Sequence, residues 1–409
     1  MKDCPDFHRV PGAGASAGRH LALAWVLGSL SAFGPLATDM YLPAFPKMAG
    51  EFGVGQGRIQ LTLSVFLLGL AVGQLLWGSW SDRVGRRLPL LAGFGLFVLA
   101  SAWCAATSSD TLLILARFLM GFGGSAGVVV SRAIVRDLFE AREAARFFSL
   151  MMIVGGIAPI VGPFLGNLLL AHGSWRLIFG VLSGLGVLCW GMVWCGVPET
   201  LLRGHRLRGR VSSVLGSYGR VLADRHFMAL TLVLGCMSGV LFSYIASSPF
   251  VFMKIHGVPE ACFGLMFAMN GVGFYAGGQA NAYLLRRFSE ERLLRYGAAF
   301  NAVAVLLLVV CTWMGWGGFA VFFGLLFASL ATLSFVFPNA TALAMKPFAA
   351  EAGSASATLG IFQFVAGAAG GALAGVWGDE TALPVTLQIA AFALAGNLLL
   401  FVFTWKRRA

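Results

Sequence analysis

The chain has 409 residues, of which 58% are hydrophobic and only 11% are charged. Soluble domains carry about 25% charged residues, so this composition excludes an ordinary water-soluble protein and indicates one surrounded by lipid. The formal net charge of +12 could suggest a nucleic-acid partner. However, most lysines and arginines lie in alternate loops between apolar runs, which is the positive-inside pattern of membrane proteins and needs no polyanion.

Twelve apolar runs are each long enough to cross a bilayer, which takes about 20 residues. They cover residues 21–45, 59–80, 88–107, 112–134, 147–171, 177–197, 226–252, 262–285, 294–314, 317–344, 354–377 and 383–405. The sequence therefore predicts an all-α membrane protein with twelve transmembrane helices. Because the basic loops lie on the same side as both termini, the N-terminus and the C-terminus are predicted to be cytoplasmic.

The runs form two sets of six. Residues 1–20 are a polar leader without an apolar core, which we interpret as a cytoplasmic segment rather than a cleaved signal peptide. Residues 21–197 are the first half, 198–225 an arginine-rich cytoplasmic linker, and 226–409 the second half. Gly73-Gln74 recurs as Gly278-Gln279, and glycines of the fifth run recur at the same offset in the eleventh. This repetition predicts two halves related by a pseudo-two-fold axis normal to the membrane, a transporter arrangement.

The first run contains Asp39, the only carboxylate that the predicted spans place within hydrocarbon. A charge within hydrocarbon has an unfavourable free energy, and it usually marks a pathway for a substrate or a proton. Asp39 and Arg117 of the fourth run both lie roughly 9 Å from the outer edge of their spans, at 1.5 Å per residue. The matched depths predict mutual neutralisation, either for proton coupling or as a structural ion pair. None of the six histidines lies deep in a span, so Asp39 is the leading candidate for a proton carrier.

Two charged segments lie at the predicted inner interface. In GSWSDRVGRR, residues 78–87, two glycines permit a tight turn, and Asp82 is the one acid that could meet an arginine or a helix N-terminus. In residues 131–146, ion pairs could form at helical spacing among Arg132, Arg136, Asp137, Glu140, Glu143 and Arg146. We interpret the second segment as a solvated amphipathic turn.

The fifth run is rich in small residues and prolines, which allow helices to approach closely and introduce a kink. The residues concerned are Gly155, Pro159, Gly162, Pro163 and Gly166. Methionine and aromatic side chains could line an adaptable apolar cavity, although helix packing is the commoner role of such residues. The candidates are Tyr41, Met120, Met151, Phe242, Tyr244, Phe267, Asn270, Phe335, Phe362 and Gln363. The seven cysteines include no CxxC, so we expect neither a metal nor a disulfide framework.

Several of these motifs resemble a known family. Residues 78–87 resemble the loop signature of the major facilitator superfamily, with Trp80 in place of the usual leucine. Within that superfamily, Asp39-Met40-Tyr41-Leu42-Pro43-Ala44-Phe45-Pro46 is similar to the Bcr/CflA subgroup of drug:proton antiporters. Three further segments are similar to the same subgroup, namely Gln60-Leu61-Thr62-Leu63, Gly73-Gln74 and Ser248-Pro249-Phe250-Val251. The family's span-four arginine motif is matched by Arg117-Phe118-Leu119-Met120-Gly121.

The resemblance implies the facilitator fold and alternating access in a bacterial inner membrane. It also implies export of small amphipathic antimicrobials, such as phenicol-, bicyclomycin- or sulfonamide-like compounds, against inward proton flow. Asp39 would bind protons or substrate, Arg117 would assist proton coupling, and Asp82 would help to latch a cytoplasmic gate. The gate residues would be Gly78, Asp82, Arg83, Gly85, Arg86 and Arg87.

One departure from the family pattern bears on the direction of transport. The family's antiporter motif in span five ends G-P-x-x-G-G, whereas Asn167 follows Gly166 here and Ala158 stands at an upstream glycine position. A proton-coupled metabolite importer of the same fold is therefore the alternative. A membrane enzyme or sensor is a third reading, but the sequence has no nucleophile elbow, metal-ligand cluster or phosphate loop. We expect a monomer in the bilayer, driven by the proton gradient and without a cofactor.

Overall fold

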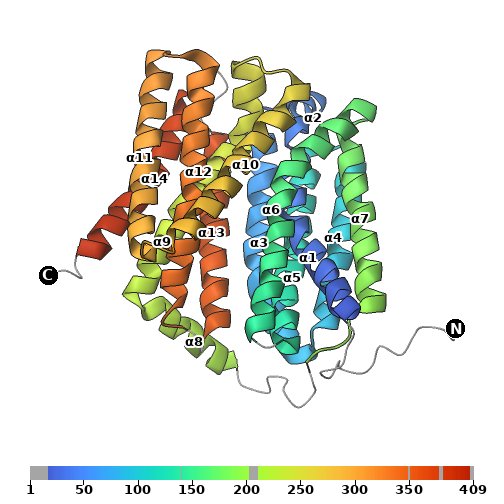
Figure 1. Cartoon of the computed structure of the whole chain (residues 1–409). Helices are drawn as coiled ribbons and strands as arrows, with labels where there is room; N and C mark the ends of the chain where they lie inside the picture. Colours follow the sequence, from blue (N-terminus) through green and yellow to red (C-terminus); the bar gives the residue numbers. More distant parts are fainter. Residues whose placement is uncertain (1–16, 140, 202–210, 349–350, 377–380, 406–409) are drawn as a thin grey trace. The chain divides into compact units, whose positions relative to one another are not determined.

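The computed structural model describes residues 17–139, 141–201, 211–348, 351–376 and 381–405. Within these residues the chain is helical, and twelve helices have 20 residues or more (Figure 1). They are α1 (Ala17–Asp39), α3 (Gln56–Val84), α4 (Arg87–Ala106), α5 (Asp110–Leu138), α6 (Ala141–His172), α7 (Trp175–Gly196), α9 (Arg225–Pro249), α10 (Glu260–Leu284), α11 (Glu290–Met314), α12 (Gly318–Met345), α13 (Ala352–Ala374) and α14 (Leu383–Trp405).

Each long helix coincides with one predicted apolar run, so the predicted all-α, twelve-helix fold is confirmed. Among the described residues, nine helices are long and apolar enough to cross a membrane. The other three long helices, α1, α6 and α10, correspond to the runs 21–45, 147–171 and 262–285. Four shorter elements complete the fold, namely η1 (Leu42–Ala44), α2 (Phe45–Phe52), α8 (Val211–Ala223) and the π-helical η3 (Phe250–Ile255).

The first apolar run, expected to be a single span to residue 45, ends its α-helix at Asp39. Pro43 has no N–H to donate to the carbonyl oxygen of Asp39, four residues before it, so the α-helical hydrogen bonding of α1 cannot continue through this position. The chain turns through η1, and α2 then begins at Phe45 with Pro46 in its first turn, where a missing N–H costs nothing. Asp39 therefore lies at a helix end, not within a continuous span.

The described chain divides into two compact units, each with its own packing. The first comprises Met1–Tyr41 and Leu68–Arg208, and the second comprises Leu42–Leu67 and Gly209–Ala409. In the first unit, α4 packs between α5 and α7, and α1 packs on α5 and α6. Glycines permit this closeness, because a Cβ at Gly123 of α5 would lie 2.7 Å from the backbone nitrogen of Phe97 in α4. Helices in lipid associate through such small-residue contacts.

The second unit is fastened by polar contacts between its helices. Asn301 of α11 donates to the carbonyl oxygen of Ser329 in α12 at 2.9 Å, and Asn339 of α12 donates to Asn281 of α10 at 2.7 Å. Residues 42–67 belong to this unit, and an ion pair of 2.8 Å joins Lys47 of α2 to Glu260 of α10. These contacts supply interhelical attraction that hydrophobicity cannot supply in lipid.

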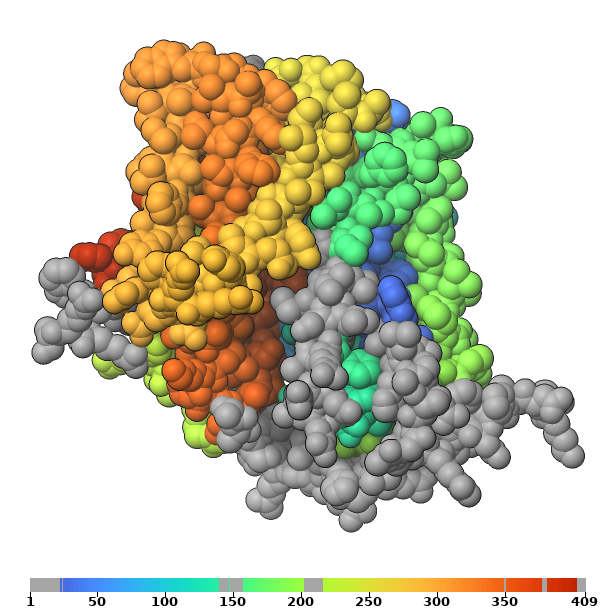
Figure 2. Space-filling model, viewed as in Figure 1, coloured from blue at the N-terminus to red at the C-terminus, as the bar shows by residue number. Residues whose placement is uncertain are grey.

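The outward face of the second unit is apolar. Figure 2 shows α10, α11 and α12 at its surface in yellow to orange. Phe300 of α11 is 67% exposed, and Val303, Leu306 and Leu307 on the same helix are exposed as well. A run of exposed apolar side chains along one helix would be unfavourable in water. It fits a helix whose outer face contacts lipid.

Candidate functional site

Asp39 ends α1 in a dry environment. Asp39 is only 3% exposed, and its Oδ1 atom accepts no hydrogen bond. The neighbouring Thr38 hydroxyl donates to the carbonyl oxygens of Pro35, at 2.7 Å, and Gly34. An unsatisfied carboxylate oxygen is costly when buried. The position therefore suits a carboxyl group that takes up a proton or accepts a donor from a ligand.

Arg117 of α5 is fully buried in the same unit. Its Nη1 donates to the carbonyl oxygen of Ala37 at 3.1 Å and lies 3.3 Å from the sulfur of Met120. Its guanidinium carbon lies 4.2 Å from the ring centroid of Tyr41 and 5.7 Å from that of Phe179. A cation over aromatic faces is stabilised by the ring quadrupole, more strongly when both are desolvated.

The expected ion pair between Asp39 and Arg117 is not formed between these described residues. Arg117 instead contacts the residues two before and two after Asp39, namely the carbonyl of Ala37 and the ring of Tyr41. Matched depth placed the two charges near the same level, but the helix break after Asp39 turns Tyr41 across the guanidinium. The roles of both residues in proton coupling stay predictions.

Helix α6 packs its glycines against this break. A Cβ on Gly162 would lie 3.1 Å from the Cβ of Asp39, and a Cβ on Gly166 would overlap the carbonyl oxygen of Met40. Pro159 and Pro163 lie inside α6, which continues through both. The predicted small-residue stripe therefore meets the Asp39 turn directly. Gly155 and Met151 lie outside the residues whose side chains the structure describes.

The predicted turn between α3 and α4 is organised around Arg86, which is 6% exposed. Its Nη1 donates to Asp82 at 2.5 Å and to the hydroxyl of Ser81 at 3.0 Å, and its Nε donates to Asp137 of α5 at 2.8 Å. We call Arg86, Asp82 and Asp137 the Arg86 cluster. Two carboxylates on one guanidinium are charge-assisted contacts, which are roughly twice as strong as neutral hydrogen bonds.

The cluster confirms that Asp82 meets an arginine and corrects a second expectation. Asp137, interpreted as part of a solvated turn, instead ties α5 to the α3–α4 turn. Asp137 is not solvated as expected, because it lies on the side of α5 that faces Arg86. The hydropathy of the segment does not reveal which side faces another helix. Glu140, Glu143 and Arg146 lie outside the residues whose side chains are described.

Glu199, which the sequence reading missed, completes the same corner. Its carboxylate accepts from the backbone N–H groups of Arg86, at 2.8 Å, and Arg87, at 3.4 Å. Arg86 is the N-cap residue of α4 and Arg87 its first residue, and N–H groups at a helix start have no partner within the helix and favour a negative charge. An acid directly after Pro198, at the end of the sixth predicted span, was the signal available in the sequence.

The remaining gate residues show which parts of the motif are buried. Gly85 has φ +112°, a conformation that disfavours any side chain, and so permits the turn into α4. Arg87 donates to the carbonyl oxygen of Trp194 in α7, whereas Arg83 is exposed. A Cβ on Gly78 would lie 3.3 Å from Val129 of α5. The motif thus joins α3, α4, α5 and α7 at one end of the first unit.

Replacing Arg86 with alanine is expected to destabilise the first unit by about 2–3 kcal/mol. This is below the usual cost of breaking a fully buried ion pair, because Asp82 is 42% exposed. Thermal unfolding of the purified protein, followed by thiol-reactive dye, measures the effect. The matched control is Arg83→Ala in the same turn, whose exposed side chain predicts a change within about 0.5 kcal/mol. Equal stability of the two variants would show that the Arg86 cluster does not stabilise the first unit.

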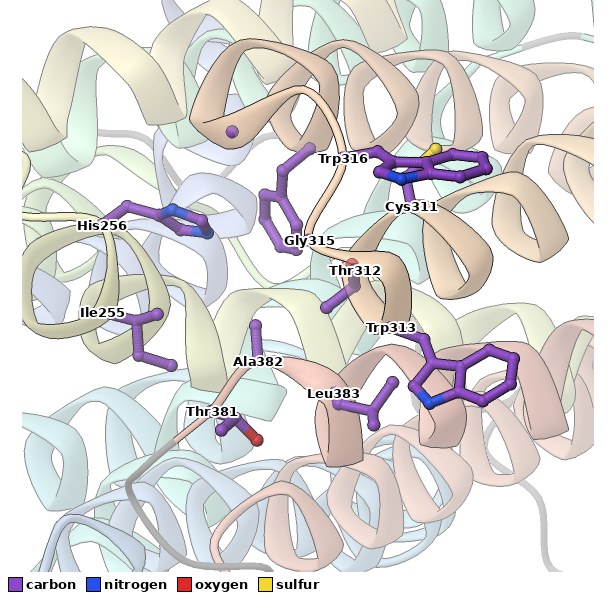
Figure 3. A pocket seen from close by; sticks show the side chains of 12 residues that line it. Ile255, His256, Cys311, Thr312, Trp313, Gly315, Trp316, Thr381, Ala382 and Leu383 are labelled. Atoms are coloured by element: carbon purple, nitrogen blue, oxygen red, sulfur yellow. The ribbon is translucent and has the colours of Figure 1, made fainter.

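The predicted cavity-lining residues fall into separate groups. Tyr41 and Met120 contact Arg117, as described above. In the second unit, Asn270 donates to the Tyr244 hydroxyl at 3.0 Å, and Tyr244 stacks on Phe267 with ring centroids 5.4 Å apart. The others, which are half-buried on α9, α12 and α13, are Phe242, Phe335, Phe362 and Gln363. None of these nine residues lines the cavity drawn in Figure 3, and the side chain of Met151 lies outside those that the structure describes. Within the described residues, no cluster of three or more His, Cys, Asp or Glu could hold a metal.

Comparison with known proteins gives the family context. The family model described as Major Facilitator Superfamily matches residues 27–371. An uncharacterized MFS-type transporter, YdgK of Bacillus subtilis, is 38% identical, over 95% of this chain and 96% of that protein. A bicyclomycin resistance protein homolog of Haemophilus influenzae is 28% identical, over 92% of this chain and 95% of that one.

Two further matches extend the comparison. The multidrug resistance protein MdtL of Shewanella oneidensis is 29% identical, over 80% of this chain and 82% of that protein. Among solved structures, a D-xylose-proton symporter superposes with a TM-score of 0.71 at 16% identity, over 94% of this chain and 97% of that one. At that identity the structural likeness shows the fold alone. The names of the bicyclomycin and multidrug resistance proteins agree with the predicted Bcr/CflA subgroup.

Proposed function

Because this chain is a member of the Major Facilitator Superfamily, and hence a transporter rather than an enzyme, we propose that it exports small antimicrobial compounds in exchange for protons. The observation that carries the proposal is Asp39, a buried carboxyl group with an unsatisfied oxygen at the break of α1. The relatives named for bicyclomycin and multidrug resistance support the substrate class. The protein would reside in a bacterial inner membrane with both termini in the cytoplasm, as the distribution of basic residues predicts.

In the proposed cycle, Asp39 binds protons and substrate in alternation. The protonated carboxyl is neutral and tolerates its dry surroundings, whereas the carboxylate requires a partner. A proton arriving from the outer side would neutralise Asp39 and displace the substrate, and release of that proton inside would reset the carboxylate. Arg117 would hold the last turn of α1 through the carbonyl of Ala37 and keep a fixed positive charge within the same region.

The substrates proposed are phenicol-, bicyclomycin- or sulfonamide-like compounds, which are small, amphipathic and rich in hydrogen-bonding groups. Asn270 and Tyr244 support this choice, because the Oδ1 atom of Asn270 is buried and accepts no hydrogen bond. A ligand N–H or O–H would satisfy it, while the rings of Tyr244 and Phe267 offer apolar faces. The energy source would be the proton gradient.

The alternative is a proton-coupled metabolite transporter that moves substrate and proton in the same direction. Asn167 favours it, because it stands where the antiporter motif has a second glycine after Gly166. The two proposals differ in the direction in which protons move relative to the substrate. The amino-acid composition does not distinguish them.

The sign of proton movement is the test. Purified protein would be reconstituted into liposomes that contain a trapped pH-sensitive dye, and chloramphenicol, bicyclomycin or sulfathiazole would be added outside. Substrate moving inward down its gradient should drive protons outward, so the lumen should become more alkaline. Protein-free liposomes and a proton uncoupler serve as controls. Acidification of the lumen by any of these compounds, beyond that seen in protein-free liposomes, would establish symport and overturn the antiport proposal.

A further inference from the structure

The second unit contains a cavity of about 410 Å³ that no part of the proposed cycle uses. Figure 3 shows it between the end of η3, the turn from α11 to α12, and the start of α14. Its walls include His256, Cys311, Thr312, Trp316, Phe322 and Leu383. Pockets of roughly 300–1,000 Å³ with apolar walls and a few convergent polar groups are typical small-molecule sites.

The imidazole of His256 is the most distinctive polar group of the wall. Its ring extends into the cavity region in Figure 3 and packs against Phe322, with ring centroids 4.9 Å apart. The Nε2 atom is shielded from solvent and has no hydrogen-bond partner. Burial lowers the pKa of His256, so the ring is neutral at pH 7 and one of its nitrogens is an acceptor. Buried polar atoms without a hydrogen-bond partner are uncommon in folded proteins, so this nitrogen is a candidate contact for a ligand.

The residues of the cavity wall limit the charge that a ligand can carry. Among the described residues that line this cavity, none is a lysine, arginine, aspartate or glutamate. The nearest cation along η3, Lys254, lies over the ring of Phe250 at 5.1 Å. An anion would therefore lose its hydration without gaining a cationic partner in the wall, and a phospholipid headgroup would meet the same obstacle.

We propose that this cavity is a second binding site, for uncharged aromatic molecules that carry an O–H or N–H donor. The flat faces of Trp316 and Phe322 would stack on the aromatic ring of the ligand. The donor of the ligand would satisfy His256, after a small shift of the imidazole brings Nε2 to the cavity surface. The hydroxyl of Thr312, which donates to Leu308 within α11 at 2.7 Å, retains acceptor capacity for a second polar group.

Cys311 in the wall provides a reporter of this cavity. It is a free, half-buried thiol, and Cys262 of α10 is a free thiol of the same exposure class that does not line the cavity. Purified protein in detergent, without any gradient, would be treated with N-ethylmaleimide, and modification at each cysteine would be quantified by peptide mass spectrometry. Chloramphenicol is the uncharged aromatic probe, and 4-nitrobenzoate is its anionic counterpart.

Chloramphenicol at ten times its dissociation constant should slow modification of Cys311 about tenfold, because modification follows the unoccupied fraction. Cys262 should not change, and 4-nitrobenzoate should not protect. Trp316→Ala should weaken protection about tenfold through loss of the stacking face. Trp25→Ala, which removes an exposed tryptophan of the first unit, should leave protection intact.

The result is separable from the transport proposal. Asp39→Asn protein should show the same protection of Cys311, whether or not it transports, because Asp39 belongs to the other unit. Equal protection by chloramphenicol and 4-nitrobenzoate, protection that survives in Trp316→Ala, or no protection would each overturn the second site. A Cys311 that reacts in detergent but is unreactive in lipid nanodiscs, with or without chloramphenicol, would assign the cavity to lipid and overturn it as well.

Discussion

Replacing Asp39 with asparagine is expected to abolish proton-driven drug export while leaving the protein inserted in the membrane at the wild-type level. Asparagine keeps the size of the side chain but cannot bind and release a proton. Because Asp39 is 3% exposed and its Oδ1 atom is unsatisfied, the neutral amide should be accepted structurally. The measurement is growth of an efflux-deficient host on a panel of phenicols, bicyclomycin and sulfonamides, with and without a proton uncoupler.

The matched control is Glu290→Gln, which removes a carboxylate from the exposed first turn of α11. It should confer wild-type resistance, and the uncoupler should remove that resistance. Substrate counterflow, which needs no net proton movement, separates lost coupling from lost binding in Asp39→Asn. Wild-type, uncoupler-sensitive resistance in Asp39→Asn would refute the assignment of the proton to this residue.

Adding a methyl group at Gly166 is expected to disrupt the contact between α6 and the end of α1. The Cβ of alanine would overlap the carbonyl oxygen of Met40, and a backbone atom cannot move aside as a side chain can. Overpacking of this kind costs about 1–3 kcal/mol. We expect Gly166→Ala to unfold at a lower temperature than wild type and to lose export in proportion, because Met40 follows Asp39 directly.

Gly180→Ala in α7 is the control for this change. A Cβ at Gly180 meets nothing within 4 Å, so alanine there should preserve both stability and export, with a small gain from helix propensity. Gly162→Ala should fall between the two, because its Cβ would lie 3.1 Å from the Cβ of Asp39. If Gly166→Ala matched Gly180→Ala in thermal stability, close approach of α6 to this turn would not be a requirement of the fold.

Much of the architecture follows from the sequence alone. Whether a segment lies in lipid depends on its own hydropathy and length, so twelve apolar runs predict the twelve long helices without knowledge of their neighbours. The turn at residues 78–87 is equally local, because Gly85 permits a φ of +112° and Asp82 reaches Arg86 one helical turn away. These features require only residues that are near one another in the chain.

The tertiary structure decided which distant residues meet. Depth along a span placed Asp39 and Arg117 at one level, but depth does not specify rotation about the helix axis or the break that follows Asp39. Likewise, Asp137 and Glu199 join Arg86 across 51 and 113 positions of sequence, and nothing local distinguishes them from solvated charges. Hydropathy determined that Asp39 is buried, and the packing of α5 and α6 around the end of α1 determined what it contacts.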